Sequence, residues 1–243
     1  MRAILTYHSI DSSGSVISLP PEVFAEHVAW FASGKVQVVH LEELLALPAA
    51  ANAVAITFDD AFTSVATHAA PLLAAHGLPA TCFVVTRHAG GDNRWGGKAD
   101  PGIPVLPIMD WSSLGALGTQ GFRLGAHSRN HRYLPRCTDA ELRDELDGSR
   151  EDLAQYAGVR ASAFAYPYGT VDARVASAAR SVFAIACTTA HRPLSKAPAR
   201  DQVPRLDAWY FSAPGALEGW GTRRFTGRVL LRHALRTVRR ALR

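Results

Sequence analysis

The sequence predicts an α/β fold in which helices cover a parallel sheet. Short apolar runs alternate along the chain with segments whose apolar residues have helical spacing, and this alternation is typical of strand–helix–strand units. The apolar runs are nearly continuous, without strict alternation with polar residues, which indicates strands that are buried on both faces. Seven such strands could form either a barrel or an open doubly wound sheet, and periodicity alone does not decide between them.

Each predicted element has a local signal. The apolar runs that we interpret as strands are residues 3–7, 36–40, 53–58, 80–85, 122–126, 161–166 and 183–187. The helical patterns between them are residues 21–33, 63–76, 111–119, 138–156 and 171–180. Gly77 follows the second helix as a C-cap, and Asp110 and Thr170 are suited to cap the third and fifth. Thr138 and Glu141 form a capping-box pattern at the start of the fourth.

Composition favours a folded globular protein without disulfides. The chain has 243 residues, of which 48% are hydrophobic and 19% charged, and this length can bury a large core. Its three cysteines are too few for a disulfide framework, so a reducing compartment is expected. No apolar run reaches the roughly 18 residues of a membrane span, and the first residues lack the apolar segment of a signal peptide. We therefore expect a cytoplasmic protein.

Polar residues follow directly after four of the predicted strands. His8 follows the first strand, Asp59 and Asp60 follow the third, and His127 follows the fifth. The sequence YPYG (166–169) ends the sixth. Because the carboxyl ends of parallel strands meet at one edge of an α/β fold, we expect these residues to lie close together. Two adjacent carboxylates at the end of a buried strand also require a compensating charge.

A divalent cation is the compensation that these residues indicate. His127 and His131 are four residues apart, so in a helical turn they lie on one face and can bind one ion. With Asp60 they form a set of one carboxylate and two imidazoles, which leaves coordination positions open. Asp59 then stays free to take a proton from water beside the ion. Alone, the aspartate pair or the histidine pair is a weak signal, because either occurs in ordinary turns. Their expected position at one edge of the sheet strengthens the signal.

These motifs resemble those of a known family. The segments TFDD, HSRNH and FAYPYG, in this order, resemble the polysaccharide deacetylases of the NodB-homology type, carbohydrate esterase family 4, and the resemblance covers residues 3–210. It implies a distorted (β/α) barrel of about seven parallel strands, in a catalytic domain that we place at residues 1–213. It also implies a divalent metal, usually zinc with cobalt or nickel tolerated, and hydrolysis of an N-acetyl group on a sugar.

The resemblance implies a role for each matched residue. Asp60, His127 and His131 match the metal ligands of the family. Asp59 matches the general base. The backbone N–H of Tyr168 matches the group that helps to hold the oxyanion, and a fixed N–H together with the metal would stabilise this charge by about 3–4 kcal/mol.

Substrate contacts are expected from the turn at Pro167 and Tyr168 and from one tryptophan. Trp95 lies in a Gly-, Asp- and Pro-rich segment, residues 88–107, that we interpret as a long surface loop. Its ring is therefore expected to be exposed and to stack on a sugar. Trp111 offers the same chemistry, but it lies in a helical pattern, where packing in the core is an equally good interpretation.

Two features depart from the family pattern. Where the family often has an arginine that orients the base aspartate, this chain has Ala165 and Tyr166, and Arg205 in the segment PRLD is a candidate replacement. Between the last predicted strand and residue 222, no clean copy is present of the late Leu-x-His motif that supplies the general acid in the family. His8 is the first candidate for this acid and His191 the second. The alternatives are a structural histidine at position 8 and a loop histidine at position 191.

Residues 222–243 form a separate basic segment. They contain eight arginines and no acidic residue, so the formal net charge of +5 is a local feature and nucleic-acid binding by the whole chain is not predicted. Helical spacing gives an apolar stripe and an arginine stripe: Leu231, Ala234, Leu235, Val238, Ala241 and Leu242, and Arg228, Arg232, Arg236, Arg239 and Arg243. We interpret residues 223–243 as a helix that contacts the anionic inner face of the cell membrane. A barrel-covering helix with a solvated arginine face and a nucleic-acid arm are the alternatives.

The sequence therefore predicts a metal-dependent hydrolase that removes an N-acetyl group from an amino sugar, in a polysaccharide or in a lipid-linked glycan of surface-glycan assembly. An enzymatic alternative uses the same residues to remove a formyl group from a lipid-linked amino sugar. Because two family motifs are missing, a catalytically inactive glycan-binding domain is an alternative of another class. The aspartate pair and both histidines argue against it, since a binding domain needs no base beside a metal.

Overall fold

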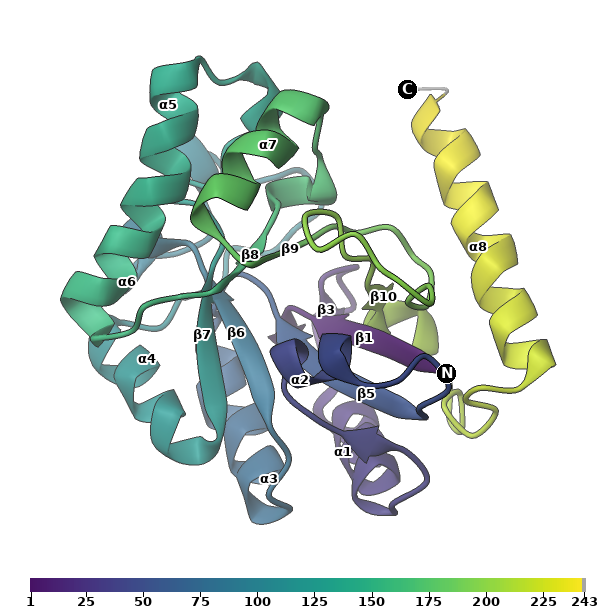
Figure 1. The fold of residues 1–243 in the computed structure, drawn as a ribbon. Helices are drawn as coiled ribbons and strands as arrows, with labels where there is room; N and C mark the ends of the chain where they lie inside the picture. Colours follow the sequence, from purple (N-terminus) through teal and green to yellow (C-terminus); the bar gives the residue numbers. More distant parts are fainter. Residues whose placement is uncertain (242–243) are drawn as a thin grey trace.

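A parallel sheet forms the centre of the fold. The computed structural model describes the backbone of residues 1–241 and the side chains of residues 1–238. The strand order is β10-β1-β5-β6-β7-β8-β9, and β4 pairs with the first residues of β5 (Figure 1). These strands are β1 (Arg2–Tyr7), β4 (Gln37–Val38), β5 (Ala53–Phe58), β6 (Ala80–Val84), β7 (Phe122–Ala126), β8 (Ala163–Ala165), β9 (Ile185–Cys187) and β10 (Leu206–Asp207). A separate parallel pair is β2 (Ser9–Ile10) and β3 (Ser18–Leu19).

The sheet curls until its two end strands approach each other. Val203, which lies shortly before β10, forms a parallel bridge with Cys187 of β9. The N–H of Val203 donates to the carbonyl of Ala186 (2.8 Å), and the N–H of Thr188 donates to the carbonyl of Val203 (2.8 Å). The predicted distorted barrel of about seven parallel strands is therefore confirmed, with the short β4 as an eighth strand beside it.

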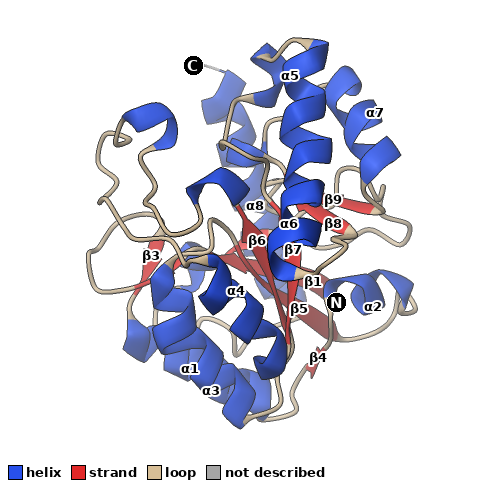
Figure 2. Ribbon diagram, turned by 90° about the vertical axis from the view of Figure 1, so that its left-hand side faces the viewer, coloured by secondary structure: helices blue, strands red, loops and turns tan. Residues whose placement is uncertain are grey.

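Helices pack around the sheet (Figure 2). They are α1 (Pro21–Ala32), α2 (Leu41–Ala46), α3 (Ala70–Ala75), α4 (Trp111–Leu117), α5 (Asp139–Arg143), α6 (Ser149–Ala157), α7 (Ala173–Val182) and α8 (Arg223–Ala241). Two π-helical turns, Val65–Ala69 and Asp144–Gly148, run directly into α3 and α6. The predicted capping box is present, since the Thr138 side chain accepts the Glu141 N–H and the Glu141 side chain accepts the Thr138 N–H. Asp110 caps α4 as predicted by accepting the N–H of Ser113 (2.8 Å).

Several local expectations were wrong or incomplete. Asp172, not Thr170, caps α7, because its Oδ1 accepts the N–H of Val175 (2.7 Å). The Thr170 hydroxyl instead donates to the carbonyl of Pro167 (3.2 Å). Helix α2 and strands β2, β3 and β10 were not predicted, since elements of two to six residues carry too little periodicity.

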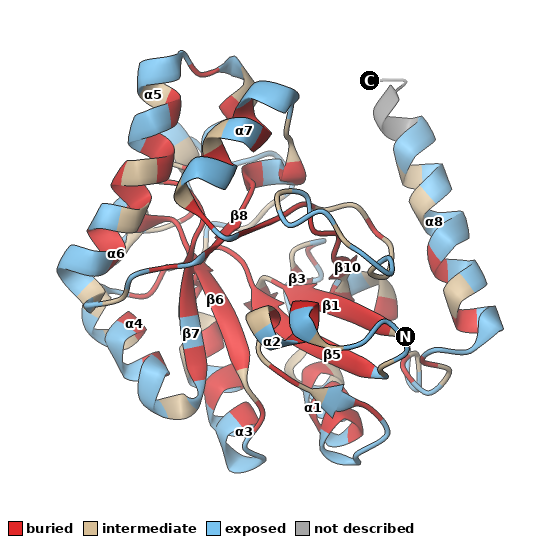
Figure 3. Cartoon of the chain, in the orientation of Figure 1, coloured by how far each residue is buried: buried red, intermediate tan, exposed pale blue. Residues whose placement is uncertain are grey.

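The strands of the sheet are buried, and the helices expose their outer sides to solvent (Figure 3). Aromatic rings pack inside it, and the Phe58 ring lies 5.3 Å from that of Tyr7 and 5.8 Å from that of Phe122. Within residues 1–241, no helix combines the length and hydropathy that crossing a membrane requires. Two positions of the predicted C-terminal stripes, Leu242 and Arg243, lie outside the described residues, as do the side chains of Arg239 and Ala241.

Candidate active site

Three loops at the carboxyl edge of the sheet have an unusual backbone. Five non-glycine residues of the described chain have positive φ values, between 54° and 67°: Asp60, Ala61, Ser128, His131 and Tyr168. They all lie in the loops that follow β5, β7 and β8. An L-residue in this region costs about 1–3 kcal/mol, and such residues cluster at functional sites. The backbone therefore points to this edge independently of any side chain.

Asp60, His127 and His131 are buried and lie together at this edge. One ligand atom of each lies within 4.8 Å of the others. Asp60 Oδ1 is 3.4 Å from His127 Nε2 and 3.5 Å from His131 Nε2, yet it has no hydrogen-bond partner. A buried carboxylate oxygen without a partner is costly. A divalent cation between the three atoms would remove this cost, so the residues fit a cation site.

The two histidines are held in a form that suits a ligand. His127 Nδ1 donates to the carbonyl of Ala165 in β8 (2.7 Å), which directs the lone pair of Nε2 toward Asp60. The backbone N–H of His131 donates to Ser128 Oγ (3.0 Å). Burial, followed by the neighbouring His127, lowers the pKa of His131 well below its usual value. The His131 ring is therefore neutral and can ligate.

Asp59 differs from Asp60 because an arginine neutralises it. The Nη1 and Nη2 groups of Arg205 donate to Asp59 Oδ1 and Oδ2 (2.6 and 2.7 Å), and both side chains are buried. Arg205 Nε also donates to the carbonyl of Thr188 (3.1 Å). Burial by itself raises the pKa of Asp59, but the charges of Arg205 and then His127 outweigh it and lower this pKa. Arg205 thus makes the contact expected of the arginine missing from the sixth strand.

A buried acid that the sequence analysis did not single out holds the histidine loop. Glu145 lies in the π-helical turn before α6 and is 1% exposed. Its carboxylate accepts the backbone N–H groups of Arg129 (2.9 Å) and Asn130 (2.9 Å) and the side-chain amide of Asn130 (2.7 Å). Because these two residues lie between His127 and His131, Glu145 fixes the loop that carries both histidines.

The two candidate acids lie in different surroundings. His8 Nε2 is 3.9 Å from Asp59 Oδ2, and its side chain is 24% exposed. His191 is buried, and its Nδ1 accepts the N–H of Asp207 (3.2 Å). Burial, followed by the charges of Arg236 and Arg232 in α8, lowers the pKa of His191 to about 3. His191 is therefore neutral near pH 7, whereas His8 lies beside Asp59.

A pocket of about 980 Å³ adjoins the cluster. Trp95 lines it but is only partly exposed, because its ring stacks on His131 (4.5 Å between centroids) and meets His88 edge-on (4.8 Å). Trp95 was expected to be exposed, and it is instead half-buried. Tyr168 contacts the His131 ring from another direction (4.5 Å) and is 42% exposed, and Pro167 before it is buried. Tyr133, also 42% exposed, adds an aromatic ring that the sequence analysis did not consider.

Together these features define an α/β-barrel protein whose carboxyl edge holds a buried carboxylate–imidazole cluster suited to a divalent cation. The family model "Polysaccharide deacetylase" matches residues 47–183, which is more than half of the chain and includes the whole cluster. The chain belongs to the polysaccharide deacetylase family.

Known proteins resemble the chain in sequence and in fold. YxkH of Bacillus subtilis (strain 168), named for the same family, is 23% identical over 181 residues, which cover 72% of this chain and 60% of YxkH. The chain thus spans about three fifths of this curated relative. The Streptococcus pyogenes deacetylase PplD in complex with acetate has a TM-score of 0.75 at 21% identity, over 90% of this chain and 97% of PplD. BC0361, a polysaccharide deacetylase from Bacillus cereus, has a TM-score of 0.70 at 20% identity, over 85% and 64% of the two chains. At such identities the two structures show the fold alone.

Proposed function

We propose that this chain removes an N-acetyl group from an amino sugar of a polysaccharide or a lipid-linked glycan by metal-assisted hydrolysis. The observation that carries the proposal is the difference between two adjacent carboxylates. Asp60 has an unpartnered oxygen beside two imidazoles, whereas Asp59 is paired with Arg205. One carboxylate can therefore ligate a cation while the other accepts a proton. Membership of the family supports an N-acetylated glycan as the substrate class.

Asp60, His127 and His131 would hold the cation. The unpartnered Asp60 Oδ1 and the contact from His127 Nδ1 to a backbone carbonyl support this assignment. A set of one carboxylate and two imidazoles accepts several divalent ions, of which zinc is our first choice and cobalt or nickel the others. A bound divalent cation supplies Lewis acidity to the acetamide carbonyl and to the attacking water.

The other residues move protons and stabilise the developing charge. Asp59 takes a proton from the water that attacks the acetamide carbonyl, and Arg205 keeps the Asp59 carboxylate in position. The backbone N–H of Tyr168 donates to the carbonyl oxygen as negative charge develops on it, and together with a bound cation it would stabilise this charge by about 3–4 kcal/mol. His8 gives a proton to the sugar nitrogen as the C–N bond breaks, and acetate leaves.

Trp95, Pro167 and Tyr168 would contact the sugar. Trp95 and Tyr168 line the pocket beside His131, which supports this role, and Pro167 sets the turn before Tyr168. Aromatic rings are suited to apolar contact with the faces of sugar rings. Arg132 and Arg136 also line this pocket, so hydrogen bonds to the polar groups of a glycan are available.

A location of this chain in the cytoplasm stays a prediction.

Measuring the acid that is released tests the proposal. The zinc-loaded wild type and Asp59→Asn would be incubated with N-acetylglucosamine oligomers and with a membrane glycolipid extract, after circular dichroism has shown that both are folded. Acetate from the wild type alone would support deacetylation. Formate would instead assign the deformylase function. No acid from either substrate, in a chain that retains zinc, would contradict hydrolysis of these glycans and favour a binding domain.

A further inference from the structure

The first turns of helix α8 bury apolar side chains, and the helix then runs along the outside of the barrel (Figure 1). Phe225 and Val229 are buried, at 1% and 3% exposure. The large apolar side chains of the later turns are between 48% and 63% exposed: Leu230, Leu231, Leu235 and Val238. A helix that only covered the barrel would direct such side chains inward. Their exposure on one helix indicates an interaction surface.

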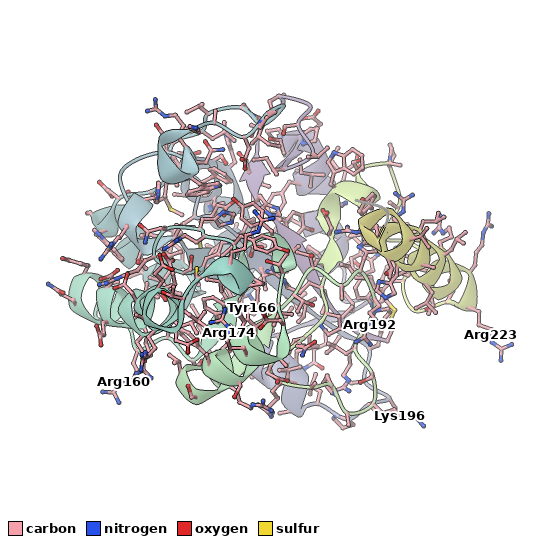
Figure 4. The ribbon with its side chains drawn as sticks, turned by 90° about the horizontal axis from the view of Figure 1, so that it is seen from above. Arg160, Tyr166, Arg174, Arg192, Lys196 and Arg223 are labelled. Carbon is pink, nitrogen blue, oxygen red and sulfur yellow. The ribbon has the colours of Figure 1, made fainter. Side chains whose placement is uncertain are left out.

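Arginines border this apolar stripe on the side toward the barrel. Arg232 and Arg236 lie over the ring of Tyr210, at 4.3 and 5.3 Å from its centroid. With Leu231 and Leu235 they line a groove of about 570 Å³ between α8 and the chain around residues 210–216. These two arginines therefore contact the body of the protein while the apolar side chains of the later turns are exposed, which differs from a barrel-covering helix with a solvated arginine face. Arg223, at the start of α8, extends away from the body of the molecule (Figure 4).

The exposed turns of α8 lie toward the carboxyl edge of the sheet, where the candidate active site is. Near the start of α8, the hydroxyl of Thr226 lies 3.8 Å from Sδ of Met1, which precedes β1. Three turns later, Arg236 pairs with Asp207 (3.4 Å). Asp207 belongs to β10, which pairs with β1 two residues before His8. The helix therefore runs from the amino edge of β1 toward its carboxyl edge.

We propose that α8 binds the surface of an anionic lipid bilayer and thereby holds the active-site edge of the barrel beside that surface. Exposed leucines can enter the interfacial region while neighbouring arginines contact lipid phosphates, as in other interfacial helices. Charge selects the anionic surface, because residues 222–243 contain eight arginines and no acid. Binding itself does not depend on the proposed function. Delivery of a lipid-linked glycan to the site rests on that function.

Vesicle co-sedimentation of the full chain tests the proposal. Vesicles of phosphatidylcholine with about 30% phosphatidylglycerol would be compared with pure phosphatidylcholine. We expect binding to the anionic vesicles that weakens at high salt. The double substitution Leu231→Ser and Leu235→Ser should weaken this binding at least about tenfold. The matched control Leu72→Ser, at a 37% exposed leucine of α3, should leave it unchanged.

Several outcomes would overturn the proposal. These are no binding to anionic vesicles, equal binding to both vesicles, or unchanged binding by the double variant. Another is a dimer of the wild type and a monomer of the double variant in light scattering, without vesicle binding. The exposed apolar side of α8 would then be a contact between two copies of the chain. The release of acid from N-acetylglucosamine oligomers should be the same for the wild type and the double variant. If neither releases acid, the proposed function fails and the vesicle result still stands.

Discussion

Replacing Arg205 by methionine is expected to lower the free energy of unfolding by about 3–5 kcal/mol. Both terminal nitrogens of Arg205 lie within 2.7 Å of Asp59, its Nε contacts Thr188, and its side chain is 0% exposed. Methionine fills much of the same space but leaves the Asp59 carboxylate buried without its counter-charge. Removing one partner of a buried ion pair costs about this amount, because the remaining charge stays desolvated.

Urea unfolding of the wild type, Arg205→Met, Asp59→Asn and the double variant measures this effect. A chelator would be present throughout, so that metal binding does not contribute to the stability. Asp59→Asn alone leaves a buried guanidinium unpaired and should also be destabilised by several kcal/mol. The double variant removes both charges and should lie within about 2 kcal/mol of the wild type. A loss below about 1 kcal/mol for Arg205→Met, or additive single effects, would refute the reasoning.

Three further predictions follow from the surroundings of the site. Glu145→Ala removes three hydrogen bonds from the histidine loop and should weaken zinc binding about 10–100-fold in a competition titration, whereas the exposed Glu151→Ala should not. Burial lowers the pKa of His191 to about 3 in the folded chain, so as the pH falls below 6.5 the unfolded chain takes up a proton first. The contribution of His191 to the free energy of unfolding is therefore retained above pH 6.5 and should fall by about 2 kcal/mol at pH 5. Urea unfolding at both pH values should show this loss in the wild type, and His191→Leu should lack it. His8→Ala should abolish acetate release but keep zinc, and near-wild-type release would remove His8 from the mechanism.

Local signals explain why much of the cluster could be predicted from the sequence. The strand predicted at residues 53–58 has the bounds of β5, and that at 122–126 has the bounds of β7. Each ends in a polar motif that a parallel fold brings to one edge. Asp59, Asp60 and His127 could therefore be expected near one another before any coordinate was known.

Contacts between residues that are distant in the sequence could not be predicted, because they depend on how the sheet curls. Arg205 is 146 residues from Asp59, and they meet only because the sheet curls until Val203 bridges to β9. Trp95 was expected to be exposed, but the histidine loop covers part of its ring.

Glu145 is different, because a local signal for it was present. The buried Leu142 lies three residues before it, a helical spacing that places Glu145 next to the buried side of the helix. A buried acid requires a partner, and here the partner is the loop that carries His127 and His131.

Zinc content and acetate release, measured on the same samples of wild type, Asp59→Asn and Asp60→Asn, test the assignment of the two carboxylates most directly. We predict bound zinc and acetate release for the wild type, zinc without acetate for Asp59→Asn, and neither for Asp60→Asn. Zinc retained by Asp60→Asn, or acetate released by Asp59→Asn at a rate near that of the wild type, would contradict the central claim.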